Sequence, residues 1–257
     1  MFGVVPKPLW QKRIPPDERN RIPLALRCLL VETPDALVLI DTGVGNKESE
    51  KFHEIYGIEN AGTPSRLETA LRGAGFHPDD VDIVIDTHLH FDHAGGNTHH
   101  SEGGSVRLSF PKARYVVQRG EWEYAHWRNE RIQASYLPHN YEPVEQAGVF
   151  DFVTGGSQIV PGVDVLPTPG HTPHHQSVVI KSEDEVACFL ADVMPTSAHL
   201  PLPWIMAYDV EPLVTLESKR KLLARARTEH WLLVFEHDPV VAWGYLTSEE
   251  KPGLQVV

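Results

Sequence analysis

The stretch that decides the fold is DIVIDTHLHFDHAGGN, residues 82–97. It opens with DIVID, an apolar run whose branched residues favour a buried β-strand. Four side chains able to bind a metal ion follow within six residues: His88, His90, Asp92 and His93. If the two outer histidines of HLH continue the extended chain, both imidazole rings face the same side. The glycines of AGGN then supply a turn. The spacing therefore predicts a strand that ends in a cluster of metal ligands.

Three further candidate ligands follow other apolar runs along the chain. His171 lies in TPGHTPHH, Asp192 closes the predicted strand ACFLAD, and His237 closes the predicted strand LLVFEHD. Taken singly, each is more commonly a capped or solvated residue than a ligand. Together with the cluster they make five histidines and two aspartates, a donor set that suits zinc and also iron, manganese or cobalt.

The order of the remaining elements indicates the fold class. Apolar runs typical of strands occupy residues 25–32, 36–41, 82–86, 114–118, 163–166, 177–181, 186–192 and 231–235. Helices are predicted over residues 64–75, 120–127 and 212–226, where proline or apolar periodicity marks the start or the buried face. Strands come first and mixed strands and helices follow. This order favours an α+β fold, a four-layer αββα sandwich, in a single domain over residues 1–257.

The composition limits the class of partner. The chain has 23 basic and 35 acidic residues, a formal net charge of −12, and two cysteines. An acidic balance argues against nucleic acid and, more weakly, against an anionic membrane surface. The sequence has neither an apolar run of ~20 residues nor the order of a signal peptide. We expect a cytoplasmic protein that acts on a small molecule and binds neither nucleic acid nor membrane; a homodimer stays open.

The ligand set and the run Asp41-Thr42-Gly43 after ALVLI resemble the metallo-β-lactamase superfamily. HLHFDHAGG and EHD are more similar to its lactonase and organophosphate-hydrolase (methyl parathion hydrolase-like) branch than to the antibiotic-degrading branch. The resemblance covers roughly residues 24–238 and implies the αββα fold with a two-metal site. The family pattern implies that one ion is bound by His88, His90 and His171. It implies that the second ion is bound by Asp92, His93 and His237, and that Asp192 bridges the two ions.

A site of this kind predicts hydrolysis. Two ions about 3.5–4 Å apart can share one hydroxide and polarise a carbonyl or phosphoryl oxygen. Asp92 can orient that hydroxide and pass a proton to the leaving group. His199 and Tyr208 could stabilise an oxyanion, although packing is the commoner role for loop residues. We predict a hydrolase with two divalent ions, zinc favoured, in which the hydroxide attacks a small neutral ester or lactone, with phosphotriesters as a side activity.

Several other residues bear on the site. Asp41 is either a partner that fixes the tautomer of a ligand histidine or a turn residue. Pro195 stands where lactonases of this superfamily often carry a tyrosine, three residues after Asp192, so Tyr208 or His199 would have to take that role. Most histidines close to the ligands in sequence are expected to be structural or solvated: His99, His100, His174 and His175.

Two proline-rich loops and four alternative functions complete the predictions. Residues 1–23 and 193–209 carry many apolar side chains, with five cationic residues in the first loop and none in the second, so we expect them to line a pocket for a neutral substrate with an apolar arm. The alternatives are a mononuclear iron thiol or persulfide dioxygenase, which would leave His93 idle, and a glyoxalase II-like thioesterase, whose family adds a C-terminal helical domain. The acidic balance disfavours a nuclease, and the complete ligand set disfavours a non-catalytic scaffold.

Overall fold

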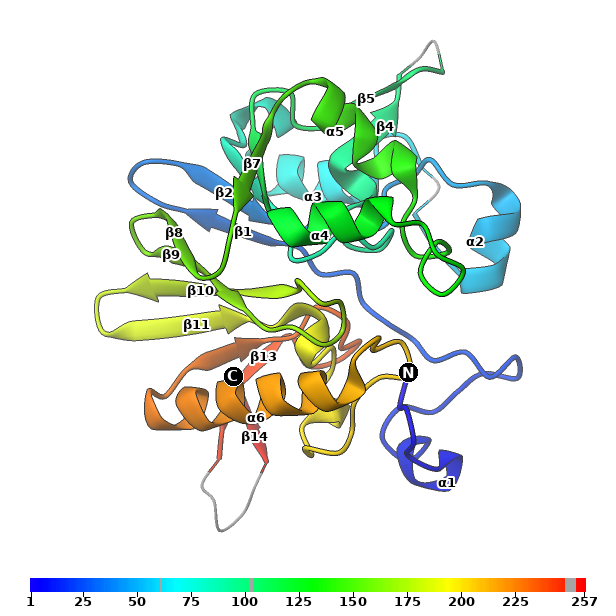
Figure 1. Cartoon of the computed structure of the whole chain (residues 1–257), viewed down its shortest axis with the longest axis vertical. Helices are drawn as coiled ribbons and strands as arrows, with labels where there is room; N and C mark the ends of the chain where they lie inside the picture. The colour runs from blue at the N-terminus through cyan, green and yellow to red at the C-terminus, as the bar shows by residue number, and fades with distance from the viewer. Residues whose placement is uncertain (61, 102–103, 248–252) are drawn as a thin grey trace. The chain divides into compact units, whose positions relative to one another are not determined.

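The structure is a computed structural model that describes residues 1–60, 62–101, 104–247 and 253–257. The chain divides into two compact units. The central unit is Cys28–Thr154, and the terminal unit is Met1–Arg27 together with Gly155–Val257. In each unit helices pack against a β-sheet (Figure 1). The predicted α+β class is confirmed, whereas a single domain over residues 1–257 stays a prediction.

The sheet of the central unit has the strand order β1-β2-β3-β6-β7. Its strands are β1 (Leu29–Glu32), β2 (Leu37–Ile40), β3 (Ile83–Ile85), β6 (Arg114–Gln118) and β7 (Phe150–Val153). β1 and β2 are antiparallel, and the pairs β2–β3, β3–β6 and β6–β7 are parallel. Every residue of β2 and β3 is buried, as expected for parallel strands covered on both faces. This burial explains their uninterrupted apolar sequences.

Four helices and a separate hairpin complete the central unit. They are α2 (Glu50–Tyr56), α3 (Arg66–Gly73), α4 (Arg119–His126) and α5 (Glu142–Gln146), with β4 (Thr98–His100) paired to β5 (Val106–Leu108). Ser65 begins α3, because its hydroxyl accepts from the Glu68 amide at 3.2 Å. Leu71 of α3 and Val144 of α5 join Leu39 of β2 in one buried apolar cluster. The two helices are thus held on the sheet by the same core.

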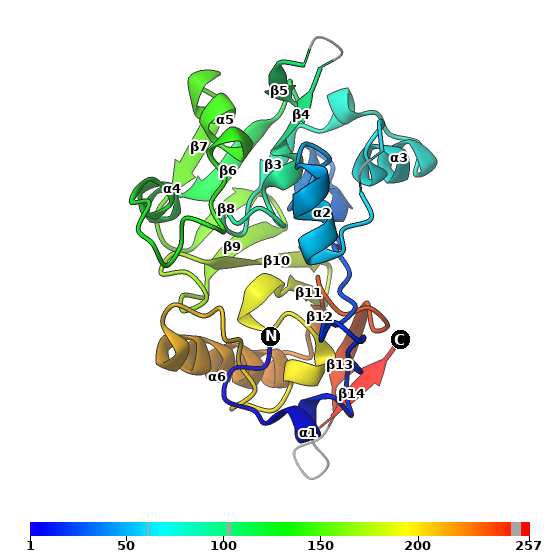
Figure 2. The ribbon, with the colours of Figure 1, turned by 90° about the vertical axis from the view of Figure 1, so that its right-hand side faces the viewer.

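The sheet of the terminal unit has the order β14-β13-β12-β11-β10-β9-β8 (Figure 2). Its strands are β8 (Ser157–Val160), β9 (Val163–Pro167), β10 (Gln176–Ser182), β11 (Glu185–Phe189), β12 (Leu232–Val234), β13 (Trp243–Leu246) and β14 (Leu254–Val256). Only β11 and β12 pair in parallel among these neighbours. The chain between these two strands contains α6 (Pro212–Thr228), which is the crossover that a parallel pair requires.

Helix α6 is anchored on its sheet by apolar burial. Leu222 and Leu223 pack in a cluster with Leu233 of β12 and with Trp231, which is fully buried. Burying one leucine side chain contributes about 1.5–3 kcal/mol. The N-terminal segment adds the short helix α1 (Lys7–Trp10). Among the described residues, no helix combines the length and apolar character needed to cross a membrane.

Short 3₁₀ helices lie in the loops, and one of them corrects a prediction. They are Pro78–Asp80, Gly95–Asn97, Pro138–Asn140, Ala191–Val193 and Ser197–His199. Strand β11 ends at Phe189, so Asp192 lies in the 3₁₀ turn after it and not on the strand as predicted. The positive φ of Ala191, 47°, takes the chain out of the extended conformation. β12 likewise ends at Val234, three residues before His237.

The three predicted helices form, with ends within two residues of the prediction. Strand prediction is less complete, because β4, β5, β7, β8, β13 and β14 are not among the predicted strands. Their sequences are short and interrupted by polar residues or glycine: THH, VRL, FDFV, SQIV, WGYL and LQV. Such segments give little periodic signal.

Candidate metal centre

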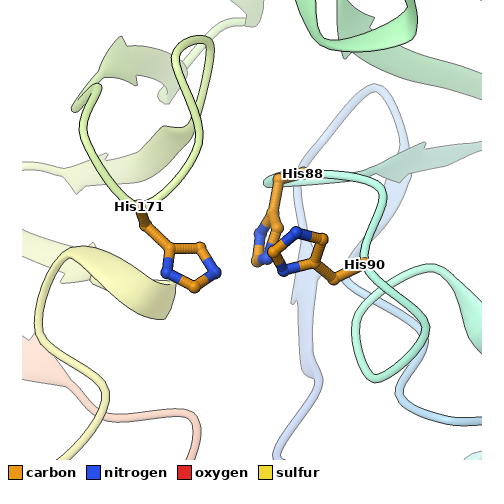
Figure 3. A group of neighbouring side chains, drawn as sticks. All are labelled: His88, His90 and His171. Carbon is orange, nitrogen blue, oxygen red and sulfur yellow. The ribbon is translucent and has the colours of Figure 1, made fainter. Parts of the chain in front are cut away.

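Four candidate ligands come from the loop that follows β3 in the central unit. The imidazole ring centroids of His88 and His90 are 4.5 Å apart, and those of His88 and His93 are 4.0 Å apart. Figure 3 shows His88 and His90 side by side on this loop. The three rings are buried, whereas the side chain of Asp92 is 29% exposed. The loop therefore gathers the predicted cluster and leaves the carboxylate of Asp92 open to solvent.

The turn after β2, which contains Asp41-Thr42-Gly43, packs against this loop and supports it. Thr42 donates to the carbonyl of His93 from its amide at 2.7 Å and from its hydroxyl at 2.9 Å. The two chain segments approach so closely that a Cβ on Gly96 would lie 2.2 Å from the carbonyl oxygen of Thr42. Lys47 donates to the carbonyl of Thr98 at 2.8 Å. Backbone contact between DTG and AGGN thus fixes the path of the ligand loop.

Asp41 is the side chain that ties β2 to the ligand loop. Its carboxylate accepts from the amide and the hydroxyl of Thr87, both at 2.7 Å, and from Nδ1 of His93 at 3.0 Å. A hydrogen bond at Nδ1 leaves Nε2 of His93 as the ligating nitrogen. Burial and the neighbouring charge of Asp41 raise the pKa of Asp86 well above its ordinary value, and the amide of Asn97 donates to Asp86. Asp41 therefore orients the candidate ligand His93, as expected for one of its two predicted roles.

Glu121 of α4 is a supporting residue that the sequence did not reveal. It is fully buried, and its Oε1 accepts from the amide of Leu89 at 3.1 Å and from the hydroxyl of Tyr136 at 2.7 Å. The ring of Tyr136 meets His90 edge-on, with centroids 4.7 Å apart. Leu89 separates the first two ligand histidines, so this carboxylate holds the backbone between them.

The terminal unit contributes the other three candidate ligands from three separate loops. His171 lies between β9 and β10, Asp192 lies in the 3₁₀ turn after β11, and His237 follows β12. Figure 3 shows His171 on its loop. One oxygen of Asp192 is 3.1 Å from Nε2 of His171, and the other is 3.1 Å from Nε2 of His237. A single buried carboxylate thus faces two imidazoles, an arrangement suited to bridging two ions.

Each histidine of this second set has an oxygen at its other ring nitrogen. Nδ1 of His171 is 3.1 Å from Oδ1 of Asp209, and Nδ1 of His237 is 2.8 Å from the carbonyl oxygen of Ala25. In the central unit, Nδ1 of His88 is likewise 3.1 Å from the hydroxyl of Thr87. With His93, four of the five candidate histidines therefore present Nε2, the tautomer expected of metal ligands.

His175 supports the carboxylate of this set through the backbone. Its Nε2 accepts from the amide of Asp192 at 3.1 Å, and its Nδ1 lies 2.9 Å from the hydroxyl of Thr168. The other three histidines that flank the ligands in sequence are less buried: His99 in β4 is partly buried, and His100 and His174 are exposed. Of these four residues, His175 is the one that orients a candidate ligand.

The donor set fits divalent ions of the zinc class. It consists of imidazole and carboxylate groups, which zinc, iron, manganese and cobalt all accept. The two thiols do not compete, because Cys188 lies in the apolar core of the terminal unit, where burial raises its pKa to about 12. Cys28 is a free cysteine packed beside the core of the central unit.

The two candidate oxyanion residues occupy different environments in the terminal unit. His199 is fully buried, its ring stacks on Phe2 with centroids 4.6 Å apart, and its Nδ1 is 2.7 Å from the hydroxyl of Thr196. Burial, with a smaller contribution from the charge of Lys219, lowers the pKa of His199 to about 3, so the ring is neutral at ordinary pH. Tyr208 is 60% exposed. Their catalytic roles stay predictions.

The two proline-rich loops pack largely against each other. Phe2 and Trp204 meet edge to face with centroids 5.9 Å apart, and Phe2 also stacks on Trp10 at 5.2 Å. Met194 belongs to the core beneath α6, and Met206 is buried. Phe2 and Ile14 anchor the N-terminal segment on residues 193–209 through Ala198 and Trp204.

Comparisons with known proteins agree with this geometry. Residues 22–237 match the metallo-β-lactamase superfamily. An N-acyl homoserine lactonase from Bacillus cereus is 31% identical over 241 residues, which cover 90% of this chain and 85% of that protein. The crystal structure of a probable metal-dependent hydrolase from Staphylococcus aureus has a TM-score of 0.90 and 30% identity, and covers 99% of this chain and 91% of its own.

A third similar protein is an N-acyl homoserine lactone hydrolase whose structure holds the product N-hexanoyl-L-homoserine at its catalytic metal centre. It has a TM-score of 0.64 and 28% identity, and covers 84% of this chain and 82% of its own. The predicted superfamily and its fold are confirmed. The chain belongs to the metallo-β-lactamase superfamily and is a metal-dependent hydrolase.

Proposed function

We propose that this protein is a dinuclear metal-dependent lactonase that opens the ring ester of small neutral lactones, with N-acyl homoserine lactones as the substrate class. The observation that carries the proposal is the carboxylate of Asp192, whose two oxygens face Nε2 of His171 and Nε2 of His237. The names of the relatives supply the substrate class, since the Bacillus cereus protein is an N-acyl homoserine lactonase.

The ligand assignment of the proposal follows donor groups among the described residues. The proposal assigns one ion to His88, His90 and His171, which Figure 3 draws, and the other ion to Asp92, His93 and His237. Asp192 is proposed as the bridging ligand. The proposed cofactor is accordingly two divalent ions, with zinc favoured.

The protein residues of the proposed reaction have distinct tasks. When bound, the two ions supply a Lewis acid for the carbonyl oxygen and lower the pKa of a water molecule. The carboxylate of Asp92, 29% exposed, holds a proton and delivers it to the alkoxide oxygen that leaves when the ring opens. His199 and Tyr208 are proposed to assist at the oxyanion, since Pro195 offers no hydroxyl. The neutral ring of His199 can act only as a neutral hydrogen-bonding group.

Three other activities are candidates for comparison. A phosphotriester is neutral and has a polarisable phosphoryl oxygen, so slow turnover is expected as a side activity. A mononuclear iron dioxygenase would use the first ion site alone, and the hydrogen bond that Asp41 makes to His93 would then support an idle residue. A glyoxalase II-like thioesterase would share both ion sites and differ in its substrate.

The test combines metal content with substrate preference on one sample. Purified protein should carry close to two zinc-class ions per chain by elemental analysis and should open N-hexanoyl homoserine lactone in a pH-indicator assay. Thioesters, phosphodiesters and persulfides serve as controls, and light scattering determines whether the protein is a homodimer. One tightly bound iron, or turnover of a control substrate without lactone opening, would overturn the proposal.

A further inference from the structure

Lys219 of α6 is a charged residue buried in the terminal unit. Its side chain is 1% exposed, although a lysine is seldom fully buried unless it is paired. Nζ donates to the carbonyl oxygens of Pro201 at 2.8 Å and Trp204 at 2.9 Å, lies 3.4 Å from that of Leu202, and also donates to that of His199. The ammonium group has three protons. All of them are therefore used within one short stretch of backbone, residues 199–204.

That stretch of backbone leads directly to a candidate metal ligand. Five residues after Trp204, Asp209 accepts from the amide of Met206 at 3.1 Å through Oδ2, and its Oδ1 lies 3.1 Å from Nδ1 of His171. The amide of Val210 donates to the carbonyl of His171 at 3.2 Å. The position of Asp209, and with it the orientation of the imidazole, depends on how residues 199–204 are held.

Helix α6 also holds the loop of His171 from the other side. The hydroxyl of Ser218, next to Lys219 in sequence, donates to the carbonyl of Pro169 at 2.7 Å. A Cβ on Gly170 would lie 2.2 Å from the backbone nitrogen of Thr215, so the loop runs directly over the first turn of the helix. Adjacent residues of one helix thus anchor both partners of the hydrogen bond between His171 and Asp209.

We propose that Lys219 is a positioning residue for the metal ligand His171, acting through the backbone of residues 199–204 and the carboxylate of Asp209. The inference rests on the proposed function, because it takes His171 as a ligand. A neutral side chain of similar length would fill the same space but would remove the lysine hydrogen bonds to the carbonyls of His199 and Trp204, whereas the carbonyl of Pro201 would keep the amide of Trp204 as a donor. Carbonyls that lose their donor in a partly or fully buried place seek other partners, so the segment and Asp209 would shift.

The test compares two lysines of the same helix. Lys219→Met removes the buried donor, whereas Lys221→Met removes an exposed lysine whose Nζ lies 3.6 Å from Glu217. Zinc affinity is measured by competition with a chelator at a temperature well below the Tm of every variant. Lys219→Met should weaken binding about 10–100-fold, the range for partners of metal ligands, and Lys221→Met less than 2-fold.

Asp209→Asn gives a second route that does not disturb the helix. It should weaken zinc binding as Lys219→Met does. The variant that carries both substitutions should bind zinc no more weakly than the single variant with the lower zinc affinity, because both substitutions disturb the orientation of His171 through Asp209. If Lys219→Met fails to fold, normal zinc affinity in Asp209→Asn overturns the proposal. A folded Lys219→Met with a lower Tm and normal zinc affinity overturns it as well, since Lys219 is then only structural.

These outcomes are separate from the fate of the proposed function, because zinc affinity is measured without substrate. A wild-type protein that binds two ions and opens no lactone refutes the lactonase and leaves the role of Lys219 intact. A wild-type protein that binds no zinc-class ion refutes both.

Discussion

The two sets of candidate ligands, one from each unit, are built in different ways. In the central unit four donors share one loop of six residues, His88 to His93, which follows a single strand. In the terminal unit His171, Asp192 and His237 come from three loops that follow three strands. Donors on a shared loop are placed together by one backbone path, whereas dispersed donors each need a support of their own.

The supporting hydrogen bonds reflect this difference. In the central unit Asp41 accepts from both Thr87 and His93, so one carboxylate holds the loop at two points. In the terminal unit Asp209 supports His171 and the carbonyl of Ala25 supports His237. Replacing a supporting residue should therefore disturb several candidate ligands in the central unit but a single candidate ligand in the terminal unit.

The largest effect is expected when one ligand is removed from either set. His88→Ala and His171→Ala should each lower kcat/KM by more than about 1,000-fold, because losing the ion removes several kcal/mol of charge stabilisation. Elemental analysis should show lower metal content in both variants. If either variant keeps full metal content and turnover, the two sets do not act as one centre.

Asp92→Asn should have the next largest effect, on turnover more than on metal binding. The amide keeps the shape of the side chain but cannot take or give the proton, so kcat should fall by about 100-fold or more while KM changes little. Steady-state kinetics on metal-loaded protein provides the measurement. Near-normal kcat at full occupancy would show that Asp92 has no part in proton transfer.

The contrast between the supports is tested by Asp41→Asn and Asp209→Asn. Each should weaken zinc affinity by about 10–100-fold. Asp41→Asn should in addition lower the Tm of the metal-free protein, since Asp41 accepts three hydrogen bonds from the ligand loop, whereas Asp209→Asn should change the Tm little. Equal losses of Tm would remove the distinction drawn between the two units.

The smallest effect concerns acid stability and His199 in the terminal unit. Burial lowers its pKa to about 3, with a further contribution from Lys219, whereas an unfolded histidine titrates near about 6.5. Between these values the unfolded state binds more protons, so this contribution to stability is present above about pH 6.5 and is lost as the pH falls towards about 3.

Wild-type protein should therefore lose more Tm between pH 6.5 and pH 4 than His199→Gln does, in matched thermal scans of the metal-free proteins. Tyr208→Phe, a change at an exposed position, serves as the control and should have the same pH slope as wild type. Identical slopes for all three proteins would mean that His199 is not held neutral by burial.

The sequence by itself was sufficient to predict the α+β class and the superfamily, and it also indicated the seven residues that stay candidate ligands. Four of these candidates lie within the six residues HLHFDH, where strand periodicity and the following glycines act over a few residues. Helix α6 could also be predicted from the sequence, because Pro212 at its start and the cations towards its end are local signals. Such features depend on neighbours in the chain and need no knowledge of the fold.

Tertiary structure alone decided the supports of those ligands. Glu121 is 32 residues from Leu89 and Asp209 is 38 residues from His171, yet each pair is joined by a hydrogen bond. Lys219 meets backbone carbonyls, which every residue offers and which therefore leave no trace in sequence. The position of Asp192 was also decided by the tertiary structure, because its place in a turn after β11 depends on the positive φ of Ala191. Partners joined across the chain are selected by how strands and helices pack, and a linear pattern carries no record of that packing.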